Sequence, residues 1–316
     1  MRTLLPERLA SPEMTPQFSN DPVRIRVPAT SANLGPGYDC LGISLDIEDS
    51  LIAQVLPTGL EVTVHGEGAD GVSLDESHLV IRAMRKAFEV LGGQPTGLRL
   101  TCHNQIPHGR GLGSSSAAIV GGLLLARSLV QGGEQLFPTQ MMLELATEME
   151  GHPDNVAPAI LGGFVVSGQS ADRVWATNAQ LTAEVDAVVF IPDSEASTHS
   201  TRALLPTTID HADASANTGR AALLMVALAG QPAHLLQATE DFLHQEYRAT
   251  AMPESHELVG ELRARGHAAV ISGAGPTVLC FNISGDEGAA QISALAPNGW
   301  QVRRVVLGGP GGRVLS

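Results

Sequence analysis

Residues 107–118 read Pro-His-Gly-Arg-Gly-Leu-Gly-Ser-Ser-Ser-Ala-Ala, and this stretch is the strongest indication of the fold. Its three glycines alternate with other residues, which fits neither a regular helix nor a packed strand and allows a ligand to approach the backbone closely. Three serines follow, and a long apolar helix is expected from about Ala117. Free N–H groups with positive partial charge lie at a helix N-terminus, so anions bind there. Residues 107–118 therefore predict a phosphate loop.

Two familiar phosphate-binding sequences do not match this loop. A Walker A loop requires a lysine after its last glycine, and no lysine follows Gly113. The dinucleotide fingerprint has two residues before its last glycine, whereas Gly109, Gly111 and Gly113 are separated by single residues. The plain alternative is a helix cap preceded by a flexible segment. The motifs elsewhere in the chain favour the phosphate loop.

The composition indicates a globular protein with a core of small aliphatic side chains. The 316 residues are 43% hydrophobic and only 3% aromatic, a length that suits two domains. The formal net charge of −14 argues against a nucleic-acid or anionic membrane surface, which requires clustered Lys and Arg. Three widely spaced cysteines form no metal-binding or disulfide pattern. We therefore expect a cytoplasmic protein with neither a nucleic-acid nor a membrane partner.

The order of apolar runs and turns divides the chain into three parts. Residues 1–21 contain three prolines among polar residues without a period, and we expect a loose N-terminal tail. Residues 22–180 are expected to form the domain that holds the phosphate loop, with the polar stretch 167–180 at its end. Residues 181–316 show the order strand, helices, strand, strand, helix, strand, which predicts a split βαβ sandwich. The expected fold class is α+β.

A polar loop follows the first expected strand, Val23–Val27, which Pro28 is expected to end. Residues 29–39 are bordered by glycine and proline and lead to another apolar run. Ordinary turn chemistry also produces such a loop. Within it, Asn33 and Asp39 are the side chains able to bind an amino or hydroxyl group.

Two acids lie in the last turn of a helix expected from about Thr139 to Glu150, where Gly151 stops it. The negative end of the helix dipole disfavours Glu148 and Glu150 there by roughly 0.3–1 kcal/mol each. A bound cation would offset that cost, and Mg²⁺ held with ATP phosphates takes only one or two protein carboxylates. The alternative is that both acids face solvent.

Further clusters of polar side chains lie downstream. Residues 152–158 read His-Pro-Asp-Asn-Val-Ala-Pro and place several functional groups in a turn bounded by prolines. Residues 197–202 read Ser-Thr-His-Ser-Thr-Arg, and Arg248 ends an expected helix. Residues 272–277 read Ser-Gly-Ala-Gly-Pro-Thr and connect two expected strands.

Together these motifs resemble the GHMP kinases, which act on galactose, homoserine, mevalonate and phosphomevalonate. The phosphate loop is similar to the ATP loop of that family, and residues 272–277 are similar to its third motif, which returns over the loop. Residues 30–39, 151–158 and 197–202 are most similar to the members that act on homoserine. The motifs run from about residue 23 to residue 307, so the resemblance covers nearly the whole chain.

The resemblance implies an N-terminal domain of the ribosomal-S5 type and a C-terminal ferredoxin-like domain, with the active site between them. It implies transfer of the γ-phosphoryl group of ATP to the side-chain hydroxyl of L-homoserine, on the way to threonine. It also implies Mg²⁺ as the metal, and it is compatible with a homodimer.

The resemblance further implies which residues bind each ligand. Ser115 and Glu150 are implied to hold Mg²⁺, with Glu148 as the alternative. The residues implied to bind the nucleotide are Pro107, His108, Gly109, Arg110, Gly111, Leu112, Gly113, Ser114, Ser115, Ser116, Ala117, Gly273 and Gly275. The residues implied to surround homoserine are Asn33, Asp39, His152, Asp154, Asn155, Thr198, Arg202 and Arg248, the two arginines binding its carboxylate as a guanidinium fork does.

Three residues are implied to take part in catalysis: Asn155, Asp154 and Arg202. Many GHMP kinases carry an aspartate at the position that Asn155 matches, and an amide is not a useful base. Because a loose phosphoryl-transfer transition state needs mainly positioning and charge neutralisation, Asn155 is expected to orient the attacking hydroxyl. Asp154 stays open as a general base. Arg202 is expected to stabilise the developing charge.

Three other functions stay open on the sequence. The acceptor of a GHMP kinase could be another small alcohol, such as shikimate or mevalonate. The chain could be a non-catalytic protein that keeps the nucleotide site. A serine hydrolase using Ser114, Ser115 or Ser116 is the third, although the Gly-x-Ser-x-Gly elbow is missing.

Overall fold

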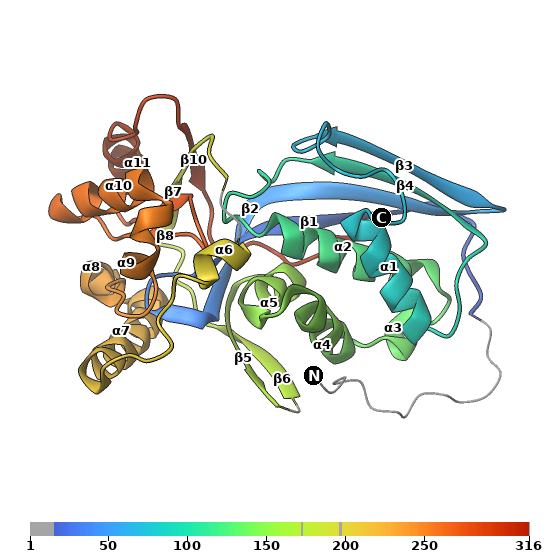
Figure 1. Cartoon of the computed structure of the whole chain (residues 1–316), viewed down its shortest axis with the longest axis horizontal. Coiled ribbons are helices and arrows are strands. Elements are labelled where there is room, and N and C mark those ends of the chain that lie inside the picture. The colour runs from blue at the N-terminus through green and yellow to red at the C-terminus, as the bar shows by residue number, and fades with distance from the viewer. Residues whose placement is uncertain (1–15, 172, 196–197, 316) are drawn as a thin grey trace.

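Two β-sheets covered by helices organise the computed structural model, which describes residues 16–171, 173–195 and 198–315. Figure 1 shows the larger, N-terminal sheet on the right and the smaller, C-terminal sheet on the left. The side chains of Thr198 and His199 are outside the described part.

Seven strands form the first sheet: β1 (Val23–Asn33), β2 (Gly37–Leu56), β3 (Gly59–Gly66), β4 (Gly97–Asn104), β5 (Phe164–Ser170), β6 (Arg173–Ala179) and β11 (Arg313–Val314). The order β11-β1-β2-β4-β3 makes the path of the sheet, and β5 pairs with the beginning of β2 and with β6. Only β3 and β4 pair in parallel among these described strands. The helix between β3 and β4 provides the crossover that a parallel pair requires.

Five helices cover one face of this sheet (Figure 1): α1 (Leu79–Val90), α2 (Ser114–Leu129), α3 (Gly133–Leu136), α4 (Thr139–Glu150) and α5 (Pro153–Leu161). Helix α2 lies centrally because two glycines let it approach its neighbours. A Cβ on Gly121 would lie 2.4 Å from Leu51 Cδ1, and a Cβ on Gly122 would lie 2.5 Å from the Val80 carbonyl oxygen. Helix α2 begins at Ser114, three residues before the expected start, so the serines form its first turn.

Four antiparallel strands form the second sheet in the order β10-β7-β9-β8: β7 (Asp186–Ile191), β8 (Ala269–Ile271), β9 (Val278–Asn282) and β10 (Gln301–Val305). Helices α10 (Pro253–Ala264) and α11 (Gly285–Ser293) pack on one face of this sheet. The chain order β7-α10-β8-β9-α11-β10 is the expected ferredoxin-like arrangement, and the α+β fold class is confirmed.

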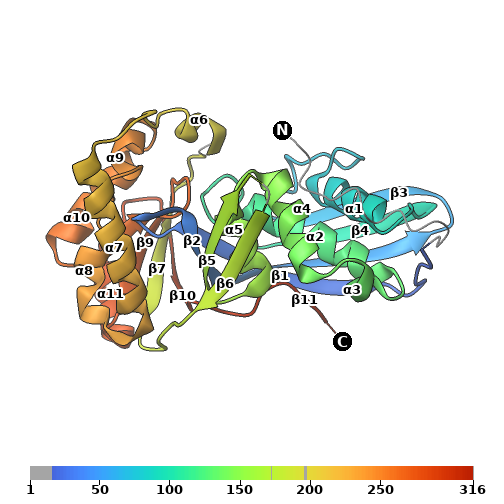
Figure 2. The same ribbon diagram turned by 90° about the horizontal axis from the view of Figure 1, so that it is seen from below.

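The other face of the second sheet joins the core of the first domain. Ala187 and Val189 pack there with Leu224 and Leu228 of α7 (His211–Gly230), in one cluster with the first domain's buried residues. Figure 2 shows strands β7, β9 and β10 between helices α10 and α11 and the N-terminal domain. The segment between β7 and α10 also contains α6 (Thr198–Arg202), η1 (Pro232–His234), α8 (Leu235–Ala238), α9 (Gln245–Arg248) and η2 (Ala249–Ala251).

Two further elements differ from the expectation. The first strand does not end at Pro28: β1 continues to Asn33 through a register shift between Pro28 and Thr30. A bulge of this kind lets a strand accommodate a proline that lacks a backbone donor. The polar stretch 167–180 contains most of the β5–β6 hairpin, whose exposed outer positions explain its polarity.

Both ends of the described chain extend the first domain beyond the expected limits. Residues 17–19 hydrogen-bond with the end of α2, and Phe18 packs edge-on against Phe88. Residues 307–315 leave the second sheet and return to the first, where β11 pairs with β1. An alternating pattern of apolar and polar residues does not show which sheet a strand joins. The pairing of β11 with β1 is therefore decided by the tertiary fold. No helix in the described ranges is long and apolar enough to cross a membrane.

Candidate active site

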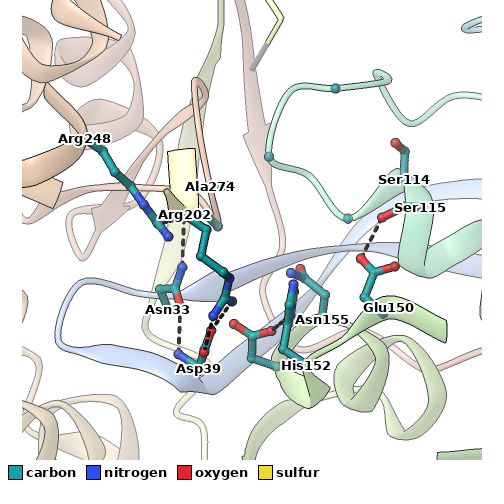
Figure 3. Close-up of a pocket in the computed structure, with 15 residues that line it drawn as sticks. Asn33, Asp39, Ser114, Ser115, Glu150, His152, Asn155, Arg202, Arg248 and Ala274 are labelled. Atoms are coloured by element: carbon teal, nitrogen blue, oxygen red, sulfur yellow. Dashed lines mark hydrogen bonds and ion pairs between the residues drawn. The ribbon is translucent and has the colours of Figure 1, made fainter. Parts of the chain in front are cut away.

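The two domains meet around a cavity of about 250 Å³, shown in Figure 3. The first domain contributes the β1–β2 tip, the phosphate loop and the junction between α4 and α5. The second domain contributes α6, α9 and the turn between β8 and β9. The cavity is lined by Asn33, Asp39, Gly109, Gly111, Gly113, Ser114, Ser115, Glu150, His152, Asp154, Asn155, Arg202, Arg248, Gly273 and Ala274. It thus unites all the expected homoserine-binding residues except Thr198, whose side chain falls outside the described residues.

The phosphate loop adopts a backbone that only glycine fits at two positions. Gly111 and Gly113 have φ values of 78° and 70°, in the left-handed region. A Cβ on Gly113 would lie 2.0 Å from Thr30 Oγ1, and one on Gly111 would lie 2.3 Å from the Ser272 carbonyl oxygen. The loop therefore leads directly into Ser114 at the N-terminus of α2, with its backbone open to the cavity.

Hydrogen bonds from both domains hold the phosphate loop. The Thr30 N–H donates to the Leu112 carbonyl at 3.0 Å, and the Thr277 N–H donates to the Arg110 carbonyl at 3.1 Å. The Ser272 hydroxyl donates to the Gly111 carbonyl at 2.6 Å. The glycine-rich turn at residues 272–277 therefore packs on the loop from the second domain, so both domains hold the backbone of the loop.

Not every expected nucleotide residue faces the cavity. Leu112 and Ala117 are buried in the core. Arg110 turns to the second domain, where it donates to the carbonyls of Pro192 and Asp193 at 2.9 and 2.6 Å. Glu195 pairs with it at 3.0 Å. The Arg110 guanidinium thus links the loop to the segment that leads to α6.

Glu150, and not Glu148, reaches the serines of α2. Its Oε1 accepts hydrogen bonds from Ser115 Oγ at 2.6 Å and from Ser116 Oγ at 2.9 Å. Glu148 is exposed. Because Ser115 and Ser116 lie in the first turn of α2, its positive end faces the Glu150 carboxylate and offsets the unfavourable end of α4. The carboxylate and hydroxyl oxygens are ligands that Mg²⁺ accepts, so this pair fits the metal expected with ATP.

The beginning of α5 presents an acid, an amide and an imidazole to the cavity. His152 is the N-cap residue, and its Nδ1 lies 2.5 Å from Asp154 Oδ1. Burial alone would lower the pKa of His152, but the hydrogen bond and charge of Asp154 raise it above its usual value. Asn155 Oδ1 accepts a hydrogen bond from Thr30 Oγ1 at 2.8 Å. That bond leaves the amide N–H groups of Asn155 available to a ligand.

Asn33 and Asp39 adopt left-handed backbone conformations, with φ values of 66° and 54°. Such conformations cost free energy in residues other than glycine and concentrate at functional sites. The Asn33 side chain bridges the domains, because its Nδ2 donates to the Gly273 carbonyl at 2.8 Å while its Oδ1 accepts from the Asp39 N–H at 3.0 Å. Arg202 binds Asp39 with two parallel hydrogen bonds of 2.7 and 2.6 Å.

Arg248 of α9 lines the same cavity and is buried, with only 2% of its surface exposed. None of the carboxylates in the described part of the chain forms an ion pair with it. Its guanidinium lies 5.6 Å from the centre of the Tyr38 ring, and the Arg202 guanidinium lies 5.4 Å from the same ring. A buried guanidinium without a carboxylate beside it is costly unless an anionic ligand binds there.

A second cavity of about 290 Å³ lies beside the first, and both include Ser114 and Ser115. His108, expected to bind the nucleotide, lies in this second cavity rather than in the first. Its full lining is Asp49, Leu51, Val72, Ser73, Ser77, His78, Leu79, Val80, Cys102, Asn104, His108, Ser114, Ser115 and Ala118. A ligand that spans the two cavities passes over the N-terminus of α2.

Sequence patterns missed several residues of these sites. Tyr38 was adjacent to Asp39 in the first motif, yet nothing indicated that two arginines would stack on it. His244 lies four residues before Arg248, a helical spacing that could have indicated a contact. Asp49 belongs to an ordinary strand pattern, and only the three-dimensional structure places it in the second cavity.

The fold and the site together define a small-molecule kinase of the GHMP type. The model of the GHMP kinases N terminal domain matches residues 78–163, and the model of the GHMP kinases C terminal domain matches residues 224–299. The chain is therefore a kinase, which removes the serine hydrolase and the non-catalytic protein as alternatives. In the described residues, moreover, Ser115 and Ser116 donate to Glu150 rather than to a histidine.

Individual relatives show to which group of GHMP kinases the chain belongs. A homoserine kinase of Streptomyces avermitilis is 51% identical over 300 residues, which cover 95% of this chain and 98% of the relative. A homoserine kinase of Mycolicibacterium smegmatis is 44% identical over 290 residues, which cover 89% of this chain and 92% of the relative. The chain belongs to the homoserine kinases.

One solved homoserine kinase agrees with this membership, and a more distant structure shares the fold alone. The crystal structure of homoserine kinase from Cytophaga hutchinsonii superposes with a TM-score of 0.81 at 26% identity, over 96% of this chain and all of the other. The mevalonate kinase of L. major, solved in complex with R-mevalonate, shares the fold with a TM-score of 0.66 at 14% identity, over 94% of this chain and 99% of the other.

Proposed function

We propose that this chain transfers the γ-phosphoryl group of ATP to the side-chain hydroxyl of L-homoserine and forms O-phospho-L-homoserine, on the way to threonine. One observation carries the choice of acceptor. The cavity beside the phosphate loop contains a cluster of acids and, separately, the buried guanidinium of Arg248 without a carboxylate partner among the described residues. An α-amino acid has the complementary ammonium and carboxylate groups.

The acidic cluster is the proposed site for the ammonium group. One ligand atom each of Asp39, His152 and Asp154 lies within 4.8 Å of the others. With the Arg202 guanidinium counted against Asp39, the two carboxylates leave one negative charge while the imidazole is neutral, and this balance favours a cation. Arg248 is proposed to bind the substrate carboxylate, and Arg202 to hold Asp39 in place with its two hydrogen bonds.

Mevalonate and shikimate fit this cavity less well. Both carry a carboxylate for Arg248 but no ammonium group. Asp39 and Asp154 would then lie close to a neutral or anionic ligand, which electrostatics disfavours. The acidic cluster therefore separates an amino-acid acceptor from these alcohols.

The nucleotide is proposed to lie across both cavities. The phosphate loop and the N-terminus of α2 would hold its phosphates, and the more apolar second cavity would hold its base. Ser115 and Glu150 would hold Mg²⁺, which neutralises phosphate charge when bound. Glu150 already accepts two hydroxyl hydrogen bonds, so its carboxylate is oriented toward the loop.

Positioning is proposed to supply most of the catalysis. Asn155 is held by Thr30, and its N–H groups would donate to the acceptor hydroxyl and direct that oxygen at the γ-phosphorus. The Asp154 carboxylate already pairs with His152, which supports a binding role rather than that of a free base. With a loose transition state, the proton leaves the hydroxyl late, to solvent or phosphate. The loop N–H groups and Arg202 would stabilise the charge.

The test is an ADP-release assay with Mg-ATP and L-homoserine, L-serine, L-threonine, shikimate or mevalonate. We expect turnover with L-homoserine and little with the others. Turnover with shikimate or mevalonate in its place would refute the proposed acceptor.

Two variants then test the proposed roles at the reacting hydroxyl. Asn155→Ala is expected to lower kcat strongly, because the hydroxyl loses its orienting donor. Asp154→Asn is expected to raise the homoserine KM more than it lowers kcat, because the ammonium group loses a carboxylate. If only Asp154→Asn abolishes kcat and flattens its pH profile, Asp154 is the base and the role of Asn155 is wrong.

A further inference from the structure

Arg248 is held by few contacts for a buried arginine. Its Nη1 lies 3.2 Å from His244 Nδ1 and 3.5 Å from the Gly273 carbonyl oxygen, which is at the limit of a hydrogen bond. Its Nε has no hydrogen-bond partner within the described residues. Figure 3 shows the side chain reaching from α9 toward the cavity. The contact with His244 is therefore the main polar contact that orients the guanidinium.

The protonation of His244 follows from its other contact. The residue is 1% exposed, and its Nε2 lies 2.8 Å from the Gly35 carbonyl oxygen. A carbonyl only accepts, so Nε2 must carry the hydrogen and donate it. Arginine only donates, so Nδ1 must present its lone pair to Arg248 Nη1. Both neighbours thus require the same neutral tautomer of His244.

The surroundings maintain this neutral state. Burial, the largest effect, lowers the pKa of His244, and the Arg248 charge lowers it further. Asp241 opposes both, with Oδ1 3.7 Å from Nε2, but its carboxylate also accepts the N–H groups of Leu243, His244 and Gln245. Tyr38, with its ring centre 5.4 Å from that of His244, and Asp39 are further titratable groups near the imidazole.

We infer that His244 is a positioning residue, whose neutral imidazole orients Arg248 to bind the carboxylate of the acceptor. The inference rests on the proposed function, in which Arg248 binds that carboxylate. It links the tip of β1 and β2, through the Gly35 carbonyl, to α9 of the second domain. Substrate affinity should depend on this link, whereas nucleotide binding should not, because the phosphate loop lies at the other end of the cavity.

Substitutions at His244 can separate its two contacts. His244→Asn places an amide oxygen near the position of Nδ1, so an acceptor for Arg248 is kept and the donor to Gly35 is lost. His244→Gln places its amide near Nε2, so the donor to Gly35 is kept and the acceptor for Arg248 is lost. His244→Leu removes both and shows the effect of the cavity alone. Leu228→Ala is a destabilising control, because Leu228 is buried in α7 whereas Arg248 belongs to α9.

We expect these substitutions to change the KM for homoserine and to leave the KM for ATP nearly constant. Loss of a hydrogen bond to a charged group corresponds to a rise in the homoserine KM of roughly 10–100-fold. We expect that rise in His244→Gln and His244→Leu, a much smaller rise in His244→Asn, and an ATP KM within about twofold of wild type in all three. Equal effects of Asn and Gln, or equal effects on both substrates, would overturn the inference, since a merely structural role predicts them.

A second measurement needs neither a variant nor turnover. The ¹⁵N chemical shifts of the His244 ring in the wild-type protein report which nitrogen is protonated. Hydrogen on Nε2 alone is expected, and hydrogen on Nδ1 would overturn the inference. Wild-type turnover with L-homoserine tests the proposed function separately, so failure of the assay and failure of the His244 contact are distinguishable.

Discussion

Asp49 is a buried carboxylate that should reduce the stability of the folded chain at neutral pH. It lies in β2 with 6% of its surface exposed, and its Oδ1 accepts the N–H groups of Gln105 and Ile106 at 2.6 and 3.0 Å. Burial has the largest effect and outweighs these two hydrogen bonds, so the pKa of Asp49 rises from 3.8 to about 6. The carboxylate thus holds the two residues just before the phosphate loop, and its burial costs free energy.

The sign and size of that cost follow from the pKa difference. The folded chain binds the proton more tightly than the unfolded chain, so stability falls as pH rises from about 4 to about 6. At about 1.4 kcal/mol per pKa unit, the loss above that range is about 3 kcal/mol. Asp49→Asn keeps an oxygen for both N–H donors and removes the charge. We expect the variant to be more stable than wild type by up to about 3 kcal/mol at pH 8, with the difference vanishing near pH 4.

Urea unfolding of wild type and variant across this pH range measures the effect. Asp46→Asn is the matched control, because Asp46 lies on the same strand, is exposed, and also accepts a backbone hydrogen bond, from Val306 at 2.8 Å. That control should change stability little. A stability difference for Asp49→Asn that is independent of pH, or that favours wild type at pH 8, would refute the reasoning.

Three predictions concern the active site. Gly113→Ala places a Cβ 2.0 Å from Thr30 Oγ1 at a φ of 70°, so we expect kcat/KM for ATP to fall at least about tenfold. A value within twofold of wild type would contradict the claim that only glycine fits at this position. Glu150→Gln keeps the side-chain shape but removes the charge, and should raise the Mg²⁺ concentration for half-maximal activity about tenfold or more. An unchanged dependence of activity on Mg²⁺ concentration would exclude Glu150 as a Mg²⁺ ligand. Arg202→Lys removes the two parallel hydrogen bonds to Asp39 and should raise the homoserine KM roughly tenfold while the ATP KM stays constant. Equal changes in both KM values would argue that Arg202 has no specific role in binding homoserine.

Local sequence predicted the elements that rest on local chemistry. Helix α4 spans Thr139–Glu150 as expected, because Gly151 at a φ of 99° ends it. The alternating glycines of the phosphate loop lead into α2 as expected, although the helix begins at Ser114 rather than at Ala117. In each case the residues that determine the backbone are neighbours in the chain. Glycine, proline and helix-capping patterns suffice there.

Side-chain direction was not predictable in the same way. Arg110 belongs to the phosphate loop by sequence, yet its guanidinium binds carbonyls of the second domain. The sequence favoured Glu150 as the metal ligand but left Glu148 as an alternative, and only the packing of α4 against α2 brings Glu150 to Ser115. Both outcomes depend on how separate elements pack, which local patterns do not encode.

By itself, the sequence determined the two-domain α+β fold, the phosphate loop and the motifs that assign the chain to its family. Only the tertiary structure decided the distant partners: Arg202 with Asp39, His244 with the Gly35 carbonyl, and β11 with the first sheet. The physical reason is distance along the chain. Glycine conformations and helix ends depend on neighbouring residues, whereas buried charges are oriented by groups that folding brings from up to hundreds of residues away.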